Sequence, residues 1–423
     1  MSPTPGAPLG SRYRRLWTAA AVSSLGDGMY FTALPLLAAE LTRDPLVVSL
    51  VTLAETLPNL LFTLAAGALV DRWDRRRVMW RVDAFRFVVV AALAAAVLAG
   101  WATVPLLMAA GFLLGLGDTP FGTAAQALLP LLVSREPERL ERANGQLLGV
   151  QTLGGQFGGP PLGGLLFTLA TPTPFLADAV SFGASSALVA SIPGRFTAER
   201  ARSERPARIR AEIAEGLRWL LRNRLLRTLA VMVGLVNLAA TSWFATAVLF
   251  ARERLGVGGL GFGLLSSALA LGSIAGSLLA PRLSQRLGTA RVLLGAAATE
   301  SVATVTLGLQ SDPLAAGALL VLVGAATIGW NTVSVALRQS LIPDRMYGRA
   351  ASAYRLIAVG TAPLGAAMGG ALGRLVDLRA PFLVAGFAEL AVLLVVGRSL
   401  TTRAVAAARA AALAKAGGEP VAT

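Results

Sequence analysis

Six of the carboxylates that interrupt the long apolar stretches of this 423-residue chain are candidates for proton chemistry. A charge at the centre of a membrane-spanning helix costs about 2.5–3.5 kcal/mol on insertion scales, so it usually faces an interior cavity or a polar partner. Burial also favours the neutral form of a carboxyl group, which lets the group take up and release a proton. The six acids are Asp27, Glu55, Asp118, Asp178, Glu300 and Glu389.

Three of these acids are the stronger functional candidates. Asp27 lies near the middle of the first apolar stretch, Glu55 lies toward the outer end of the second, and Asp118 lies in the fourth. Gln126 adds a polar contact on the same stretch as Asp118. For Glu300 and Glu389 we favour an ordinary contact with a neighbouring helix or a lipid headgroup.

The composition indicates a protein that crosses a membrane many times. Of its residues, 55% are hydrophobic and 14% are charged, whereas soluble domains carry about 25% charged residues. The net charge is +15, but the basic residues lie in short segments between apolar stretches. That distribution is typical of membrane topology, so we do not expect a nucleic-acid partner.

Several kinds of chemistry are excluded by residue types that the sequence lacks. It contains no Cys and no His, which removes disulfides, Cys/His metal sites and His-based catalytic triads. It also lacks a glycine-rich phosphate loop of the Walker type, so ATP is not the expected energy source. We therefore expect no enzyme activity, no cofactor and no metal, and any proton coupling must use carboxylates.

Twelve apolar stretches are long enough to cross a bilayer, which requires about 20 mostly apolar residues. Most of them contain Gly, Pro, Ser or Thr, as expected for helices that pack closely in lipid or line a cavity. We predict an all-α membrane protein with twelve transmembrane helices. The stretches are 16–39, 46–70, 79–100, 103–131, 142–168, 174–193, 225–251, 259–284, 290–310, 313–336, 350–375 and 380–399.

The basic residues also predict the orientation, because cytoplasmic loops carry an excess of Lys and Arg. With the N-terminus inside, most of the 38 basic residues fall on the inner side. We therefore expect both termini in the cytoplasm. The basic residues that fall on the outer side are Arg43, Arg252, Arg254, Arg374 and Arg379.

Aromatic and amide side chains in the first, seventh and tenth stretches are candidates for the wall of a substrate path. Such groups bind bulky, partly apolar ligands with few fixed hydrogen bonds. Each aromatic residue also has a simpler explanation, as packing or as an anchor at the membrane interface. The candidates are Tyr30, Phe31, Asn237, Trp243, Phe244, Trp330 and Asn331.

The segment between the second and third stretches combines a glycine, an acid and a cluster of arginines. A positively charged loop would explain the arginines but not the other two residues. The pattern resembles the signature loop of the major facilitator superfamily, except that Asp74 replaces a glycine usual there. The resemblance implies a conformational gate that joins the two halves near the start of the eleventh helix. Its residues are Gly67, Asp71, Arg72, Arg75 and Arg76.

A second pattern places glycines around a proline in the fifth stretch. It resembles the fifth-helix signature of drug/proton antiporters in the same superfamily. Glycines let a partner helix approach closely and Pro160 bends the helix, although plain helix packing is the alternative explanation. Gln146 departs from a further glycine of that signature, and the fourth stretch lacks the arginine that many proton antiporters carry. The pattern consists of Gly155, Gly159, Pro160, Gly163 and Gly164.

The two halves of the chain carry corresponding patterns, because Gly365, Gly369 and Gly373 of the eleventh stretch repeat the ladder of the fifth. We predict two pseudo-symmetric six-helix bundles, as in the major facilitator fold. The predicted parts are residues 1–193 for the N-terminal bundle, 194–224 for a cytoplasmic linker with an amphipathic helix, 225–400 for the C-terminal bundle and 401–423 for a cytoplasmic tail.

From about Arg12 to Leu400 the chain resembles the bacterial efflux branch that contains enterobactin and macrolide exporters. The resemblance implies a monomeric secondary transporter in the lipid bilayer of the bacterial plasma membrane. It would export a small-molecule, amphipathic substrate by alternating access, in exchange for protons. An importer or a lysophospholipid flippase of the same fold is an alternative. A non-transporting receptor or scaffold is another, although a scaffold has no need of acids in lipid.

Overall fold

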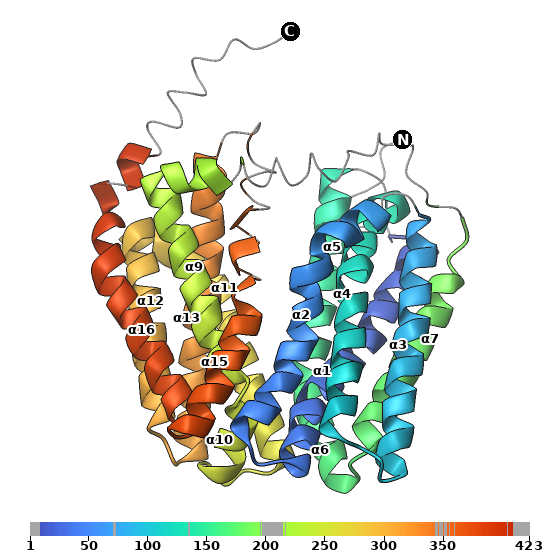
Figure 1. The fold of residues 1–423 in the computed structure, drawn as a ribbon. Coiled ribbons are helices and arrows are strands. Elements are labelled where there is room, and N and C mark those ends of the chain that lie inside the picture. The colour runs from blue at the N-terminus through green and yellow to red at the C-terminus, as the bar shows by residue number, and fades with distance from the viewer. Residues whose placement is uncertain are drawn as a thin grey trace. The chain divides into compact units, whose positions relative to one another are not determined.

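The computed structural model is helical throughout the regular structure of the residues that it describes (Figure 1). In the first half of the sequence the helices are α1 (Ser11–Leu41), α2 (Pro45–Val70), α3 (Arg75–Leu98), α4 (Val104–Val133), α5 (Pro137–Gln151), the π-helix η1 (Thr152–Gly158), α6 (Gly159–Leu169) and α7 (Thr173–Ala190). The described residues are 9–70, 73–133, 136–194, 196, 215, 217–342, 346, 350, 353–354, 356–358, 360–403 and 405–408.

The second half of the sequence is built in the same way. Its helices are α9 (Arg224–Phe244), α10 (Ala247–Glu253), α11 (Gly259–Leu287), α12 (Thr289–Gly308), α13 (Pro313–Leu341), α15 (Ala362–Leu375), α16 (Ala380–Val396) and the short 3₁₀-helix η2 (Gly397–Ser399). Capping residues start three of the longer helices, because Asp74, Asn223 and Asp312 accept hydrogen bonds from backbone N–H groups of the first turn. Such caps satisfy donors that have no partner within the helix.

Helical segments cover all twelve predicted stretches, and among the described residues eight helices are long and apolar enough to cross a membrane. Other segments fall short for local reasons. Arg81, Asp83 and Arg86 lie in the interior of α3, Asp27 and several polar residues lower the mean hydropathy of α1, η1 divides the fifth stretch, and α16 is short. The all-α membrane class is therefore confirmed, whereas the count of twelve membrane crossings stays a prediction.

The chain forms two compact units, and each includes a segment from the other half of the sequence. Unit 1 comprises residues 1–43, 54–203 and 257–267, and unit 2 comprises 44–53, 204–256 and 268–423. The start of α2 thus belongs to unit 2, and the start of α11 belongs to unit 1. The predicted linker over 194–224 lies largely outside the described residues.

In unit 1, glycines bring the predicted antiporter-type helix into backbone contact with α1. A Cβ atom at Gly159 would lie 2.7 Å from the Cα atom of Gly28 and 2.8 Å from the carbonyl oxygen of Leu25. One turn later, a Cβ atom at Gly163 would lie 2.6 Å from the Cα atom of Met29. The ladder therefore packs against α1, as the small-residue pattern predicts.

The same helix series also receives the start of α11. A Cβ atom at Gly263 would lie 2.8 Å from the backbone of Pro160, and Gly164 packs directly against Gly259. The hydroxyl of Ser267 donates a hydrogen bond of 2.8 Å to the carbonyl oxygen of Phe157 in η1. Glycines thus pack against two sides of this helix series.

Unit 2 repeats this arrangement with the eleventh-stretch glycines. Gly365 and Gly369 of α15 lie against the carbonyl groups of Leu238 and Ser242 in α9. On its other side, α15 packs against the start of α2, where Gly370 contacts Ser49. Each unit therefore contains one glycine-rich helix held between a long helix of its own half and the first residues of a helix from the other half.

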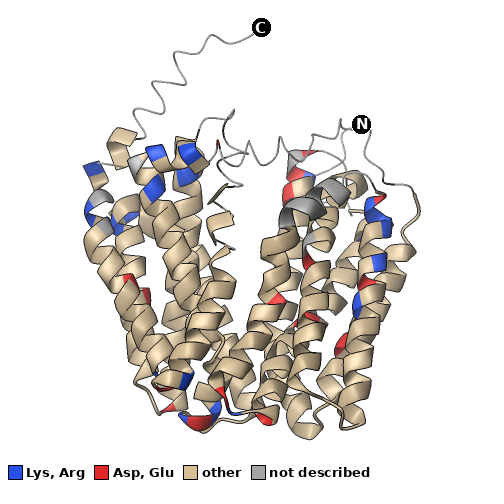
Figure 2. Cartoon of the chain, viewed as in Figure 1, with Lys and Arg blue, Asp and Glu red and all other residues tan. Residues whose placement is uncertain are grey.

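The distribution of charge within each unit follows the predicted topology of a membrane protein. In Figure 2 the arginines of the described residues lie mostly near helix ends, with long stretches between them that are largely free of arginine. Several acids lie along those stretches, away from the ends (Figure 2). The residues around these acids must compensate the cost of placing them there.

We predict that Gly159→Ala lowers the stability of the folded protein by about 1–3 kcal/mol, the usual cost of forcing an extra group into a packed interior. The added methyl group would push α6 away from Gly28 on α1. Thermal unfolding of the purified protein in detergent measures the effect. The matched control is Gly149→Ala on α5, because that position has open space around it. Equal melting temperatures for the two variants would contradict the backbone contact.

Candidate functional site

A buried arginine on α3 organises the polar interior of unit 1. The Nη2 atom of Arg86 donates to Oδ1 of Asp118 on α4, and its Nη1 atom lies 3.7 Å from Oδ1 of Asp83 one turn earlier on α3. Only 5% of the Arg86 side chain is exposed. A charge so deeply buried requires compensating partners, and the two carboxylates supply them.

The neighbours of Arg86 leave room for its guanidinium and cover its faces. A Cβ atom at Gly117 of α4 would lie 2.8 Å from Nε of Arg86, so this glycine allows the side chain to lie across the helix. The rings of Phe121 and Phe182 lie 5.1 Å and 5.4 Å from the guanidinium carbon. Aromatic rings attract a cation at such distances and also exclude water from it.

The sixth-stretch helix, α7, completes the site from the other side of α3. The hydroxyl of Ser185 donates a 2.6 Å hydrogen bond to Oδ2 of the fully buried Asp83. Asp178 is also fully buried, and Ser181 contacts its Oδ1 atom at 3.2 Å. The second carboxylate oxygen of Asp178 has no hydrogen-bond partner among the described residues.

Asp27 on α1 joins the same group of charges. Its neighbour Gly26 packs directly against Asp178 and Ser181, which brings α1 into contact with α7. Asp27 interacts electrostatically with Arg86, Asp118 and Asp83. We call Asp27, Asp83, Arg86, Asp118 and Asp178 the acid–arginine cluster, and it joins α1, α3, α4 and α7.

Two acids of the acid–arginine cluster are exposed, whereas its other members are buried. Asp83, Asp178 and Arg86 are buried, whereas Asp27 and Asp118 are exposed although both lie near the middle of long helices. The side chain of Asp118 is 56% exposed even while it bonds Arg86. Arg86 therefore links the buried Asp83 to the exposed Asp118.

Glu55 and Tyr30 lie at the edge of this cluster. Glu55 is half-buried on α2, where Gly111 and Gly115 of α4 pack against its backbone, and it interacts electrostatically with Asp118. The buried Tyr30 contacts Phe175 edge to face at 6.1 Å between ring centroids. Its hydroxyl has no partner among the described residues. Gln126 is exposed, two turns beyond Asp118 on α4.

Sequence reasoning missed Asp83 and Arg86, which are central to the site. Both follow the arginines at the start of α3, so they resembled part of a charged helix end. The available signal was an acid and a base three residues apart, which lie on one face of a helix. The fourth stretch has no arginine of its own, but Arg86 reaches Asp118 from α3.

The structure describes only part of the predicted gate. Gly67 lies in the last turn of α2, and Asp71 and Arg72 lie outside the described residues. Arg75 donates its backbone N–H to the carbonyl oxygen of Phe196 at 3.2 Å, and Arg76 donates from its guanidinium to that of Ile192. Both contacts tie the start of α3 to the segment after α7.

Asp74, which replaces the usual glycine, accepts hydrogen bonds from two parts of the chain. Its Oδ1 atom accepts from the backbone N–H of Arg77 at 3.0 Å and caps α3. Its Oδ2 atom accepts from the backbone N–H of Phe196 at 2.9 Å. One buried carboxylate therefore both starts α3 and fixes the end of α7.

The predicted wall residues fall into two groups. Phe31 and Asn331 are exposed, and Asn237 and Phe244 are half-buried. The other three are buried, Tyr30 in unit 1 and two tryptophans in unit 2. Trp243 stacks on Phe382 with centroids 5.5 Å apart, at the point where α9 ends, and Trp330 packs in a hydrophobic core. These two tryptophans stabilise the unit, whatever their part in substrate contact.

Comparison with known proteins now identifies the family. The model of the transmembrane secretion effectors, a branch of the major facilitator superfamily, matches residues 3–422. The chain belongs to this family. It is therefore a membrane transporter for small molecules and not an enzyme, and its relatives include efflux pumps.

Curated relatives cover most of the chain. The chain is 30% identical over 380 residues to the multidrug efflux pump Tap of Mycolicibacterium fortuitum, across 86% of this chain and 90% of that protein. It is 29% identical over 385 residues to Tap of Mycobacterium tuberculosis, across 86% and 87%. It is 26% identical over 216 residues to macrolide efflux protein A of Streptococcus pyogenes, across 50% and 52%.

Solved structures support the fold. A bacterial homologue of the iron transporter ferroportin, solved in an inward-facing state, gives a TM-score of 0.71 at 18% identity, with 92% of this chain and 97% of that chain covered. The nucleoside transporter NupG gives a TM-score of 0.69 at 12% identity, with 92% and 98% covered. At these identities the likeness confirms the major facilitator fold alone.

We predict that Arg86→Gln destabilises the protein strongly, by about 3–5 kcal/mol, because it leaves buried carboxylates without a cation. The melting temperature of the purified protein measures this effect. Arg81→Gln is the matched control, since Arg81 lies on the same helix but is exposed beside Trp80. The double change Asp83→Asn with Arg86→Gln should recover part of the loss. A melting temperature for Arg86→Gln equal to that of Arg81→Gln would show that the buried pair is not needed.

Proposed function

We propose that this protein exports a small amphipathic drug from the cytoplasm, a macrolide or a compound of similar character, in exchange for protons. The names of its curated relatives support the substrate class, since they are called multidrug and macrolide efflux proteins. The acid–arginine cluster supports the coupling. The observation that carries this proposal is a buried arginine bonded to an exposed carboxylate in the middle of a membrane-spanning helix.

The proposed coupling step is a change of partner by Arg86. While Asp118 is ionised, it attracts the guanidinium and holds it by a charge-assisted hydrogen bond. Once a proton neutralises Asp118, the nearest remaining negative charge is Asp83, whose Oδ1 atom already lies 3.7 Å from Nη1. Arg86 then pairs with Asp83, and its contact between α3 and α4 is released.

Asp27 extends this effect to α1. It interacts with Arg86 and Asp118, so protonation of one acid changes the charge that the other experiences. The residues on either side of Asp27 are the contact points of α1, because Gly26 packs on α7 and Gly28 packs on α6. A change of charge at Asp27 therefore acts where α1 meets two neighbouring helices.

The proposed cycle alternates between states open to opposite sides of the membrane, in a monomer whose two termini lie in the cytoplasm. The predicted division at residues 1–193, 194–224, 225–400 and 401–423 belongs to this proposal. Helices α2 and α11 are suited to transmit the change, since the first residues of each pack in the unit of the opposite half. A ligand drives such a change only through different affinities for the two states.

We predict that Asp27→Asn and Asp118→Asn each abolish macrolide transport driven by a pH gradient, to the level of vesicles without the protein. Downhill exchange of labelled macrolide should persist, because Asn resembles the protonated acid and the substrate path is unchanged. Proteoliposomes with an imposed pH gradient provide the measurement. The matched control is Asp312→Asn, an exposed helix cap in unit 2 for which Asn is also a good capping residue.

The same vesicles distinguish the alternatives. Uphill macrolide movement in both Asn variants would exclude the acid–arginine cluster as the coupling site. Movement of labelled lysophospholipid in place of macrolide would favour a flippase, and inward accumulation of substrate would favour an importer. No movement of any compound by the folded wild type would favour a receptor or scaffold.

We further propose that Asp71 acts as a gate together with Gly67, Arg72, Arg75 and Arg76. We predict that Asp71→Asn lowers efflux from whole cells several-fold at an unchanged amount of protein in the membrane, because the acid biases the balance between states. Glu136→Gln is the control, since Glu136 is exposed at the start of α5 and makes no capping hydrogen bond. Equal efflux by the two variants would count against the gate.

A further inference from the structure

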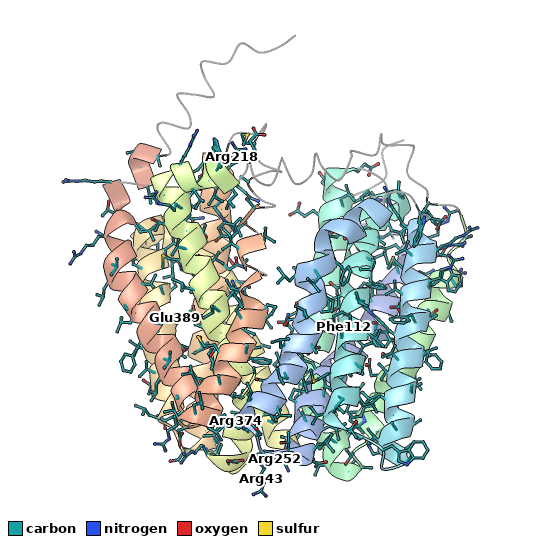
Figure 3. The ribbon with its side chains drawn as sticks, in the orientation of Figure 1. Arg43, Phe112, Arg218, Arg252, Arg374 and Glu389 are labelled. Carbon is teal, nitrogen blue, oxygen red and sulfur yellow. The ribbon has the colours of Figure 1, made fainter. Side chains whose placement is uncertain are left out.

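Unit 2 contains a second pair of buried acids, away from the acid–arginine cluster. Glu300 lies in the middle of α12 and Glu389 in the middle of α16, and their exposures are 4% and 8%. Figure 3 labels Glu389 about midway along the helices of its unit. Neither acid reaches a membrane surface, so the sequence-based explanation by a lipid headgroup does not fit their position.

Close packing of α12 on α16 brings the two acids together. A Cβ atom at Gly386 would lie 2.7 Å from the carbonyl oxygen of Ser301. Glu389 follows Gly386 by one turn of α16, and Glu300 precedes Ser301 on α12. The two carboxyl groups interact electrostatically, and Ser301 lies beside Glu389.

The hydroxyl groups around the pair fit a protonated state better than two free carboxylates. Oγ1 of Thr327 lies 2.7 Å from Oε1 of Glu300 and 2.9 Å from the carbonyl oxygen of Val323. A threonine hydroxyl has one hydrogen, so it cannot fully serve both acceptors. If Glu300 carries a proton, it donates to Thr327, and Thr327 donates to the carbonyl group.

Glu389 has a similar environment. The hydroxyl of Ser301 donates its hydrogen to the carbonyl oxygen of Ala297 at 2.8 Å, which leaves its oxygen available to Glu389 as an acceptor. The Oε2 atom of Glu389 has no hydrogen-bond partner among the described residues. A bare carboxylate oxygen in this interior is costly, whereas a carboxyl group that carries a proton is not.

Among the described residues of the helices packed around the pair, no cation lies near the two acids. The basic residues of α9, α12, α13 and α15 lie near the ends of these helices, and α16 contains none. The other charged residues of these helices are Arg224, Arg227, Arg291, Arg338 and Arg374. Two negative charges therefore cannot persist here, since like charges in an apolar interior repel each other strongly.

We propose that Glu300 and Glu389 form a second proton-binding site at the contact of α12 and α16, in which at least one of the two carboxyl groups is protonated. The oxygens of Thr327 and Ser301 complete the site and accept or release hydrogen bonds as the proton moves. Loss of this proton places two like charges at the contact of the two helices and loosens their packing. Proton occupancy thus adjusts the stability of unit 2, independently of the coupling step proposed for unit 1.

The test compares the full-length purified protein with the double variant Glu300→Gln, Glu389→Gln. Gln has nearly the shape of protonated Glu, so the variant should fold. The wild-type melting temperature should fall as pH rises from mildly acidic to mildly alkaline, because the folded state binds a proton that the unfolded chain releases. The double variant should lose this part of the pH dependence. Glu253→Gln, an exposed acid at the end of α10, should retain it.

Infrared spectra provide an independent readout. At neutral pH the wild type and Glu253→Gln should show a protonated carboxyl band from isotope-labelled glutamate that is weaker in the double variant, which retains Glu55. Identical bands and an identical pH dependence in all three proteins would overturn the proposal. The single variants Glu300→Gln and Glu389→Gln allow the same comparison if the double variant does not fold.

Sodium is the competing ligand for such a group of oxygens. If sodium chloride, but not choline chloride, raises the melting temperature at fixed pH only while both glutamates are present, the site binds sodium and the proton assignment is wrong. None of these measurements requires transport. Failure of this site therefore leaves the export proposal untouched, and failure of export leaves this site untouched.

Discussion

The interior of unit 1 depends on the burial of one guanidinium among carboxylates. Arg86 lies beside the rings of Phe121 and Phe182 and is bonded to Asp118, and only 5% of its side chain is exposed. Such an ion is tolerated only while its surroundings compensate it. The positions of α3, α4 and α7 are therefore tied to the charge state of a few acids, which is the physical requirement for coupling protons to helix movement.

Glycines allow α1 to approach α6 and α7 closely. Gly28 meets the backbone of Gly159, and Gly26 meets the side chains of Asp178 and Ser181, so the charged residue between them is fixed on a helix with close neighbours on two sides. Bulky side chains at these positions would separate α1 from α6 and α7 and move Asp27 away from its partners. Charge and close packing thus meet at three consecutive residues of α1.

The sequence predicted the broad architecture well because apolar length and small-residue spacing are local signals. The ladder at Gly155, Gly159 and Gly163 and its counterpart in the second half both pack as backbone contacts. Asp83 and Arg86 were missed because a charged pair near the start of a helix resembles the charged residues of the preceding loop. Only the tertiary structure shows that Arg86 reaches another helix. Trp243 and Trp330 were predicted as wall residues, but the structure buries both of them. The sequence of a membrane helix does not show which way an aromatic side chain faces.

The π-helical segment η1 has a consequence for how the fifth stretch tolerates change. It lies between α5 and α6, next to the glycine ladder, and π-helical turns contain more residues than α-helical turns. Deleting one residue within 152–158 can convert a π-helical turn into an α-helical turn, so the extra residue is lost without turning the rest of the helix. Gly159, Pro160 and Gly163 would then keep the face that they present to α1. Loss of a single residue is therefore better tolerated in this segment than in the α-helical parts of the fifth stretch, where it rotates everything beyond by about 100°.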